Sequence, residues 1–278
     1  MAPRSSPPPA AVLPHPPLPG AGERWALFLD VDGSLLDFAD DPTAVVVLPA
    51  LRRRLAGLHG ALDGALALVS GRALADLGRL FGDPPWTLVG LHGLERHDAA
   101  GRAQAPSIEP AQVRRMRRET AALAARLGEA VRWEDKGVAA ALHCRRAPSL
   151  LPALRREAMA LAARLPGYEL QPGDMVMEFK PAGMDKGRAV AELLAAPPFA
   201  GRRPVYLGDD LTDEHAFAAV NAARGLSVRV GGRTPSHALF TLPNPAAVQA
   251  WLSDVLDTLM KGTPPHAANP GGPPQRRP

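Results

Sequence analysis

Four short apolar segments, spaced between helical patterns, limit most strongly what this chain can fold into. They are WALFLD at 25–30, ALALVSGR at 65–72, WTLVGLHG at 86–93 and PVYLGDD at 204–210. Segments that are apolar at nearly every position are typical of parallel strands covered on both faces. Helical patterns at 49–59, 211–221 and 245–260 alternate with them. This alternation predicts a doubly wound α/β domain with a mostly parallel sheet.

The stretch from about 105 to 178 follows a different pattern, which predicts a small inserted module. One helix is expected around Met116 and Leu123 and another around Leu154 and Leu161. The segments VRWEDKGVAAALHCR and YELQPGDMVMEF alternate apolar and polar residues in places, as strands with one solvated face do. We therefore expect an inserted α/β domain at 105–180, between two parts of the main domain at 23–104 and 181–261.

Both ends of the chain are rich in proline, with eight of the 31 prolines in residues 1–20 and six in 263–278. This composition predicts disordered tails at 1–22 and 262–278. The N-terminal tail has no continuous apolar core, so we do not interpret it as a secretory signal. No apolar stretch of the sequence approaches the length of a membrane span. The single cysteine, Cys144, excludes an internal disulfide framework and fits a reducing compartment, the cytoplasm.

The formal net charge of +4 and the pI of about 9.7 raise the question of a polyanionic partner. Only four of the 32 basic residues are lysines, so the high pI reflects arginine usage. The one concentrated run, RRMRR at 114–118, has no aromatic residues interleaved with it that could stack on bases. We interpret this run as a solvated helix face and expect no nucleic-acid partner.

Polar side chains follow three of the expected strands and indicate chemistry at that edge of the sheet. Asp30 and Asp32 end the first strand, Ser70 ends the second, and Asp209 and Asp210 end the late one. Ligands of α/β sheets bind beyond the carboxyl ends of the strands. Unpaired buried carboxylates are costly, and Mg²⁺ suits a site with few carboxylates completed by water and phosphate oxygens. The pattern therefore predicts a magnesium site.

Each of these residues, taken alone, also has a purely structural explanation. A DxD sequence is often a turn or a cap, and Ser70 can begin a helix at Arg72. Lys186 can be a surface lysine, and Asp213 suits the first turn of a helix electrostatically. Their joint occurrence at strand ends favours catalysis.

The DVDGS sequence at 30–34, Ser70, Lys186 and the GDDLTD sequence at 208–213 together resemble the haloacid dehalogenase superfamily of phosphotransferases. The resemblance implies a Rossmann-like core in which Asp30 attacks phosphorus and forms an aspartyl-phosphate. It also implies that Asp32 protonates the leaving oxygen and then activates water, while the backbone carbonyl of Asp32 helps to bind Mg²⁺.

The same resemblance assigns roles to the remaining residues of these motifs. Ser70 and Lys186 would hold the phosphoryl oxygens, and Asp209 would complete the metal site. Asp210 and Asp213 would support it. These roles agree with the chemistry, because hydrolysis of a phosphate monoester requires neutralisation of the charge on the transferred group.

Longer segments resemble the bacterial trehalose-6-phosphate phosphatases over most of residues 25–258. They are FLDVDGSLLDFADDPTAVVVLPAL, ALVSGR, GLHGLE, WEDKGVAAALHCR, MEFKPAGMDKG and GDDLTDEHAF. Two positions depart from the pattern, with Val31 where family members often have Tyr or Phe and Ser34 where Thr is usual. Neither threatens the resemblance, because the backbone geometry or the hydroxyl is kept.

In that family the inserted domain is a cap that closes over the core and recognises the sugar. The resemblance implies that Glu134 and Lys136 of WEDKG and Glu178 of MEFKP bind the substrate. Charged side chains suit this role, because they make stronger hydrogen bonds to hydroxyl groups than neutral ones. Without the resemblance, Glu134 and Lys136 are equally explained by a hairpin turn before Gly137.

Other residues near these motifs also have both a functional and a structural explanation. We predict substrate contacts from Gly71, Arg72 and His92. For His92 and Glu95 of GLHGLE, a position at the end of a strand remains an alternative. We expect Trp133 to belong to the cap core and not to a sugar-stacking platform.

The sequence therefore predicts Mg²⁺-dependent hydrolysis of trehalose 6-phosphate to trehalose and phosphate, the last step of trehalose biosynthesis. One alternative is a capped phosphatase for another phosphosugar, such as sucrose phosphate or mannosylglycerate phosphate. The other is a catalytically silent regulatory module, which need not retain Asp30, Asp32, Lys186 and Asp209. We expect a cytoplasmic monomer or weak dimer without nucleic-acid or membrane partners. Its substrate is expected to be a phosphosugar supplied by a separate trehalose-phosphate synthase.

Overall fold

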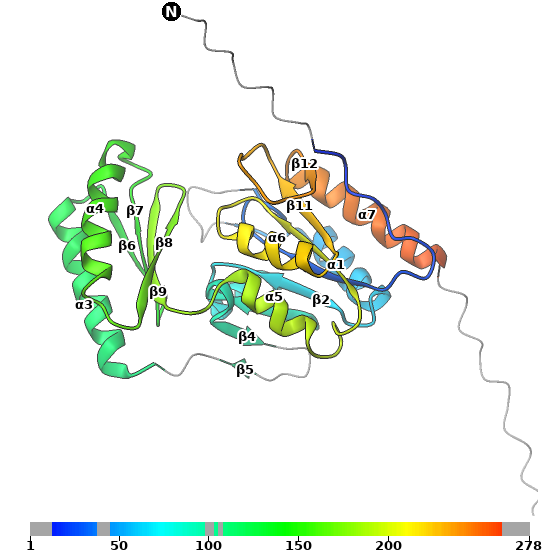
Figure 1. The fold of residues 1–278 in the computed structure, drawn as a ribbon, viewed down its shortest axis with the longest axis horizontal. Coiled ribbons are helices and arrows are strands. Elements are labelled where there is room, and N and C mark those ends of the chain that lie inside the picture. Colours follow the sequence, from blue (N-terminus) through cyan, green and yellow to red (C-terminus); the bar gives the residue numbers. More distant parts are fainter. Residues whose placement is uncertain (1–12, 38–44, 98–102, 105–107, 263–278) are drawn as a thin grey trace, which may run out of the picture.

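An eight-stranded sheet forms the larger part of the computed structural model, which describes residues 13–37, 45–97, 103–104 and 108–262 (Figure 1). Its strands are β1 (Trp25–Leu29), β2 (Leu66–Val69), β3 (Thr87–Gly90), β4 (Glu95–His97), β5 (Ala103–Gln104), β10 (Arg203–Gly208), β11 (Leu226–Val230) and β12 (Phe240–Leu242). Their order is β12-β11-β10-β1-β2-β3-β4-β5. Neighbours from β12 to β3 are parallel, whereas the β3–β4 and β4–β5 pairs are antiparallel. The predicted mostly parallel sheet is confirmed.

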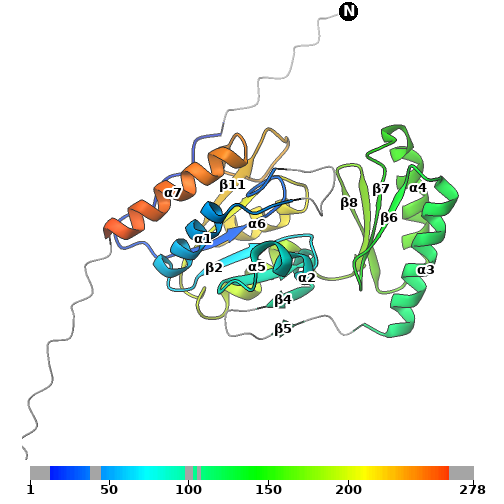
Figure 2. The same ribbon diagram turned by 180° about the vertical axis from the view of Figure 1, so that it is seen from behind.

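Helices cover both faces of this sheet, as the doubly wound prediction requires. Helices α5 (Lys186–Leu194) and α6 (Asp213–Ala222) pack against each other, as do α1 (Pro49–Ala61) and α7 (Pro245–Gly262). The two pairs lie on opposite faces of the sheet (Figures 1 and 2). Helix α2 (Leu74–Phe81) contacts β3 and β4.

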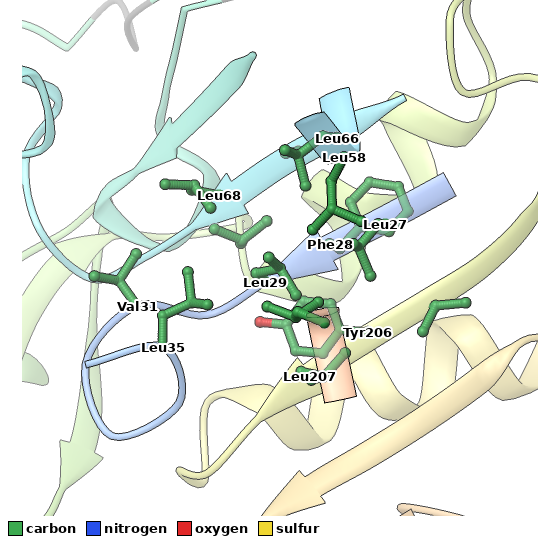
Figure 3. Packing of buried hydrophobic residues seen from close by; sticks show 14 of the residues in the cluster. Leu27, Phe28, Leu29, Val31, Leu35, Leu58, Leu66, Leu68, Tyr206 and Leu207 are labelled. Carbon is green, nitrogen blue, oxygen red and sulfur yellow. The ribbon is translucent and has the colours of Figure 1, made fainter. Parts of the chain in front are cut away.

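The central strand β1 explains why the first apolar segment has no polar face. All five of its residues are fully buried, because β2 and β10 flank it and helices cover both of its faces. Leu27 and Leu29 pack among residues of β2 and β10, including Leu68 and Tyr206 (Figure 3). Burial of this kind contributes about 1.5–3 kcal/mol for each large apolar side chain.

The strand order indicates that a ligand would bind at the carboxyl ends of β1 and β10. From β1 the chain proceeds outward to β2 and β3, and from β10 it proceeds in the opposite direction to β11 and β12. The point where the winding reverses leaves a crevice at the carboxyl ends of the two central strands. Asp30 directly follows β1 and Asp209 directly follows β10.

A second sheet of four antiparallel strands lies in residues 108–181, the cap region, which the sequence predicts at 105–180. Its strands are β6 (Arg132–Asp135), β7 (Ala140–His143), β8 (Tyr168–Gly173) and β9 (Val176–Pro181), in the order β6-β7-β9-β8. Helices α3 (Pro110–Leu127) and α4 (Leu151–Ala162) cover the side of this sheet that faces away from the core (Figure 1). The elements follow the expected order of helix, hairpin, helix and hairpin, while the boundaries at 105 and 180 stay predictions.

Trp133 and the arginine-rich run lie as their patterns indicate. Trp133 packs against the apolar cluster of the cap region and donates its indole N–H to Thr120 of α3 over 3.0 Å. In the RRMRR run, Met116 is buried, while Arg114 and Arg118 are exposed. None of the helices in the described residues is long and apolar enough to cross a membrane.

Residues 13–22 differ from the sequence prediction, which assigns them to a disordered tail. They lie beside α7 (Figure 1), with Pro16 and Pro19 buried and the carbonyl of Pro14 accepting a hydrogen bond from the Thr241 backbone N–H over 3.0 Å. Proline has no backbone N–H but keeps its carbonyl and an apolar ring, so such a segment can still bond a strand edge. The rest of the N-terminal tail and residues 263–278 lie outside the described residues.

The Trp25–Trp251 stack connects β1 to α7 and provides a test of this packing. The ring centroids are 6.1 Å apart, and the buried indole N–H of Trp251 has no hydrogen-bond partner within the part of the chain that the structure describes. We expect Trp251→Ala to lower the free energy of unfolding by about 3–5 kcal/mol. Trp251→Phe keeps an aromatic ring and removes the unpaired N–H, so it should cost clearly less. Urea unfolding followed by circular dichroism measures both, and equal losses would contradict this account.

Candidate active site

Three carboxylates meet at the crevice between β1 and β10. One oxygen from each of Asp30, Asp209 and Asp213 lies within 4.8 Å of the others. Asp30 and Asp209 follow the two central strands, and Asp213 begins α6. Asp30 is held at the sheet edge because its backbone N–H donates to the Leu207 carbonyl over 2.9 Å. Of the acids expected at the strand ends, Asp30 and Asp209 thus lie together, and Asp213 is the third member of the cluster.

Lys186 joins two of the three carboxylates. Its Nζ lies 2.7 Å from Oδ1 of Asp30 and 2.7 Å from Oδ1 of Asp213. Lys186 is the first residue of α5 and is only 3 % exposed. Burial alone lowers the pKa of this ammonium group, but Asp213 and Asp30 outweigh it and hold the pKa above its usual value. Lys186 is therefore a permanently charged cation within the site, and not a surface lysine.

Asp213 organises the loop that follows β10. Its Oδ1 also accepts a hydrogen bond from the Tyr206 hydroxyl over 2.6 Å. Its Oδ2 accepts the backbone N–H groups of Asp209 and Asp210 at 3.0 and 2.9 Å. A Cβ atom at Gly208 would lie 2.3 Å from the Asp213 carboxyl carbon, so only glycine admits this close approach. Asp213 thus fixes the backbone that presents Asp209.

The cluster carries more negative charge than Lys186 can neutralise. Burial raises the pKa of Asp30 well above its usual value, against the pull of Lys186, and the charges of Asp213 and Asp209 raise it further. Burial and then Asp213 raise the pKa of Asp209 to about 7. Three clustered oxygen donors with excess negative charge fit a hard divalent cation. The residues present are therefore compatible with the metal that the sequence predicts.

Asp32 and Ser70 lie in a neighbouring group organised by Arg72. The Arg72 guanidinium binds the Asp32 carboxylate through two hydrogen bonds of 2.6 and 2.7 Å. The backbone N–H of Arg72 donates to the Ser70 hydroxyl over 3.1 Å. A bidentate pair of this kind fixes the orientation of the carboxylate. Arg72 thus positions Asp32, a role that the sequence did not indicate.

Asp210 and Ser34 lie at the margin of the acidic cluster. The Asp210 carboxylate accepts the Leu211 backbone N–H at 2.6 Å and pairs with Arg233 at 3.4 Å. Its supporting role toward a metal stays a prediction. Ser34 donates its hydroxyl to Oδ1 of Asp209 over 3.0 Å. The hydroxyl group of Ser34, at a position where the family usually has threonine, therefore orients a carboxylate of the cluster.

Cap and core residues meet in a second, largely buried polar group. Glu178 of β9 accepts a hydrogen bond from Lys136 Nζ at 2.8 Å and lies 3.4 Å from Nε2 of His92. Lys136 also donates to the carbonyl of Gly71 in the core over 3.1 Å. Burial alone raises the pKa of Glu178, but Lys136 and then His92 hold it well below its usual range. The predicted substrate-binding residues of cap and core are thus in direct contact.

Two atoms in this group remain without a partner among the described residues. Nδ1 of His92 and Oε1 of Glu178 are buried and make no hydrogen bond to that part of the chain. His92 has a left-handed backbone with φ of 57°, and a Cβ atom on Gly71 would lie 2.7 Å from its ring. Buried polar atoms are normally hydrogen-bonded. Groups that are held rigidly and left unpaired in this way are suited to bind polar atoms of a ligand.

Glu95 and Glu134, each of which the sequence explains in two ways, have defined hydrogen-bond partners in the structure. Glu95 accepts the backbone N–H of Leu74, the first residue of α2, over 2.8 Å, so it caps a helix. Glu134 accepts a hydrogen bond from His143, which sequence reasoning passed over. Tyr206 was likewise missed, because an apolar strand gave no indication that its hydroxyl meets Asp213.

Asp213 provides a direct test of how the site is held together. Asp213→Ala should lower the free energy of unfolding by about 3–5 kcal/mol, because it breaks a buried ion pair. It should also abolish most of the phosphate release that the sequence predicts, because Lys186 and the Asp209 backbone lose a partner. Asp254→Asn, on the exposed side of α7, is the matched control and should change the unfolding free energy by less than about 0.5 kcal/mol. Urea unfolding and phosphate release measure both effects, and an unaltered Asp213→Ala protein would contradict the assignment.

Known proteins are similar to this chain in both sequence and fold. A model of the trehalose-phosphatase family matches residues 28–245. A probable trehalose-phosphate phosphatase of Sinorhizobium fredii is 44% identical over 82% of this chain and 86% of its own length. The trehalose-6-phosphate phosphatase of Escherichia coli is 38% identical over 87% of this chain and 91% of its own length.

Solved structures agree on the fold. The C-terminal domain of a trehalose-6-phosphate phosphatase of C. albicans superposes with a TM-score of 0.76 at 22% identity, covering 85% of this chain and 93% of the other. A haloacid dehalogenase-like hydrolase of Bacteroides thetaiotaomicron superposes with a TM-score of 0.60 at 15% identity, covering 86% of this chain and 99% of the other. The core therefore has the haloacid dehalogenase fold that the motifs indicated, and the chain belongs to the trehalose-phosphatase family.

Proposed function

We propose that this protein hydrolyses trehalose 6-phosphate to trehalose and phosphate through an aspartyl-phosphate on Asp30, with Mg²⁺ as cofactor. The observation that carries the proposal is the position of Asp30, bonded to Lys186 at 2.7 Å within a cluster of three carboxylates. A buried aspartate beside a fixed cation, at the crevice where α/β sheets bind ligands, is suited to attack a phosphoryl group.

In the first step, Oδ2 of Asp30 attacks phosphorus, because Lys186 binds Oδ1. The bond between phosphorus and the sugar oxygen breaks as the new P–O bond forms. Asp32 donates a proton to the leaving oxygen, so that trehalose departs as a neutral alcohol. Lys186 and Ser70 hold the oxygens of the transferred group, whose charge needs preorganised donors.

In the second step, water attacks the phosphorus of the aspartyl-phosphate. Asp32, now a carboxylate, accepts a proton from this water. The bond between phosphorus and Asp30 breaks, which releases phosphate and restores the Asp30 carboxylate. Arg72 binds both carboxylate oxygens of Asp32. One of these two hydrogen bonds has to be released for Asp32 to carry the proton that it donates in the first step, while the other still orients the side chain.

Mg²⁺ would be held by Asp30, Asp209 and the backbone carbonyl of Asp32. When bound, it would neutralise charge on the phosphoryl group and on the aspartates around it. The raised pKa values of Asp30 and Asp209, caused first by burial and then by the neighbouring carboxylates, support this assignment, because a bound cation would favour the charged forms of both groups.

We assign recognition of the sugar to Glu134, Lys136 and Glu178, together with Gly71, Arg72 and His92 on the core side. The unpartnered Oε1 of Glu178 and Nδ1 of His92 support this assignment. Sugar hydroxyls both donate and accept, so they can satisfy a carboxylate and an imidazole at once. We further propose that the protein works in the cytoplasm, as a monomer or weak dimer, on substrate made by a separate trehalose-phosphate synthase.

The nucleophile is tested by Asp30→Asn, which keeps the shape of the side chain. Phosphate release from trehalose 6-phosphate should fall by about 10⁴-fold or more, because an amide does not attack phosphorus. Chelation should abolish activity of the unaltered protein, and added Mg²⁺ should restore it. Asp254→Asn serves as the control and should retain full activity. Substantial turnover by Asp30→Asn would contradict the covalent mechanism.

The substrate assignment is tested by separate alanine substitutions at Glu134, Lys136 and Glu178. Loss of one charged hydrogen bond should lower kcat/KM for trehalose 6-phosphate by roughly ten- to hundredfold. The same variants should barely change the hydrolysis of p-nitrophenyl phosphate, which has no sugar to bind. Equal losses on both substrates would mean that these residues support the fold or the core chemistry. A panel that includes sucrose phosphate and mannosylglycerate phosphate distinguishes the related phosphosugar activities.

A further inference from the structure

The polar face of the cap sheet contains His143, a residue to which neither the sequence analysis nor the proposed chemistry gives a role. In the register of this sheet, Glu134 of β6 is opposite Ala141 of β7, and Ala141 is opposite Glu178 of β9. Side chains alternate between the two faces of a strand. His143, two residues after Ala141, therefore lies on the same face as Glu134 and Glu178.

His143 makes a close contact with Glu134 across the two strands. Nε2 of His143 lies 2.6 Å from Oε2 of Glu134, and each side chain is 27% exposed. An ionised carboxylate only accepts hydrogen bonds, so Nε2 of His143 carries the proton in this pair. Arg132 stands farther away, with 3.8 Å between its guanidinium and the same carboxylate oxygen. His143 is thus the nearest group that determines where the Glu134 carboxylate points.

The contact matters because Glu134 and Glu178 are both attracted to Lys136. Lys136 binds Glu178 at 2.8 Å. Burial raises the pKa of Glu134, but the hydrogen bond from His143, and after it the charge of Lys136, keep this pKa below its usual value. Without His143, only the more distant Arg132 among the described residues would hold Glu134 away from Lys136. The hydrogen bond from His143, which lies opposite Arg132, draws the Glu134 carboxylate toward that end of β6 and away from Lys136. The two carboxylates therefore present separate acceptors, as the binding of several hydroxyls of one sugar requires.

We propose that His143 is a positioning residue that orients Glu134 for substrate recognition and keeps it apart from the Lys136–Glu178 pair. This inference rests on the proposed function of Glu134. It assigns His143 no contact with the phosphoryl group and no proton transfer. Its effect should therefore be confined to the sugar-dependent part of the activity.

The proposal is tested by a double-mutant cycle with His143→Ala and Glu134→Ala. His143→Ala should lower kcat/KM for trehalose 6-phosphate by about tenfold, mainly through KM, and leave p-nitrophenyl phosphate hydrolysis unchanged. In a Glu134→Ala background the same substitution should change kcat/KM by less than about twofold, because its target is absent. His143→Gln keeps a donor near the position of Nε2 and should restore activity to within about threefold of the unaltered protein.

The matched control is His237, which forms a similar pair with Glu214 in the core, at 3.0 Å. His237→Ala should leave the ratio of the two activities unchanged. Additive losses in the cycle, or equal losses on both substrates after His143→Ala, would overturn the proposal. So would a failure of His143→Gln to restore activity when its unfolding midpoint matches that of the unaltered protein.

Nuclear magnetic resonance of the imidazole nitrogens tests the pair independently of any substrate. The His143 ring should carry its proton on Nε2 in the unaltered protein and lose that preference in Glu134→Ala. An unchanged tautomer would overturn the proposal. If the unaltered protein shows no preference for trehalose 6-phosphate over p-nitrophenyl phosphate, the proposed function fails. The nitrogen signals still decide whether His143 orients Glu134, and the kinetic cycle is then run with the phosphosugar hydrolysed fastest.

Discussion

The buried ion pairs of Lys186 are the constraint on which the rest of the active site depends. A charged ammonium group can remain buried only where carboxylates and hydrogen bonds replace the water it has lost. Lys186 meets this requirement by joining Asp30, 156 residues away in the sequence, to Asp213, 27 residues away. The end of β1, the start of α5 and the start of α6 must therefore assemble together. Because α5 follows the cap region directly in sequence, this contact also closes the core around the insertion.

The same arrangement explains why the site is prepared for a dication. Asp213 satisfies its own burial with four donors, two of them backbone N–H groups, and so contributes charge without being free to move. Burial, and then the neighbouring carboxylates, raise the pKa values of Asp30 and Asp209 against the pull of Lys186. A divalent cation would relieve the repulsion between these carboxylates. Fixed donors and acceptors of this type need little reorganisation during reaction.

The cap region contacts the core through residues that are also candidates for sugar binding. Lys136 bonds to Gly71, and Glu178 lies against His92, so a substrate has to enter a group of side chains that already interact. This contact between cap and core would connect sugar recognition to the phosphoryl chemistry, because Gly71 lies between Ser70 and Arg72 in the chain. Binding energy collected at the sugar can then be used to exclude water from the phosphoryl group.

The sequence by itself determined the doubly wound sheet, the presence of an inserted α/β module and the acidic residues at the strand ends. These features are local, because apolar runs and alternation depend on the neighbours of each residue in the chain, and strand ends follow from them. Tertiary structure alone decided which side chains meet. Nothing near Tyr206 in the sequence indicates that its hydroxyl bonds Asp213, and nothing near Arg72 indicates that its side chain holds Asp32. The role of Glu95 as a helix cap and that of His143 beside Glu134 likewise depend on contacts between separate segments. Register and packing set such contacts, and no local pattern of residues records them.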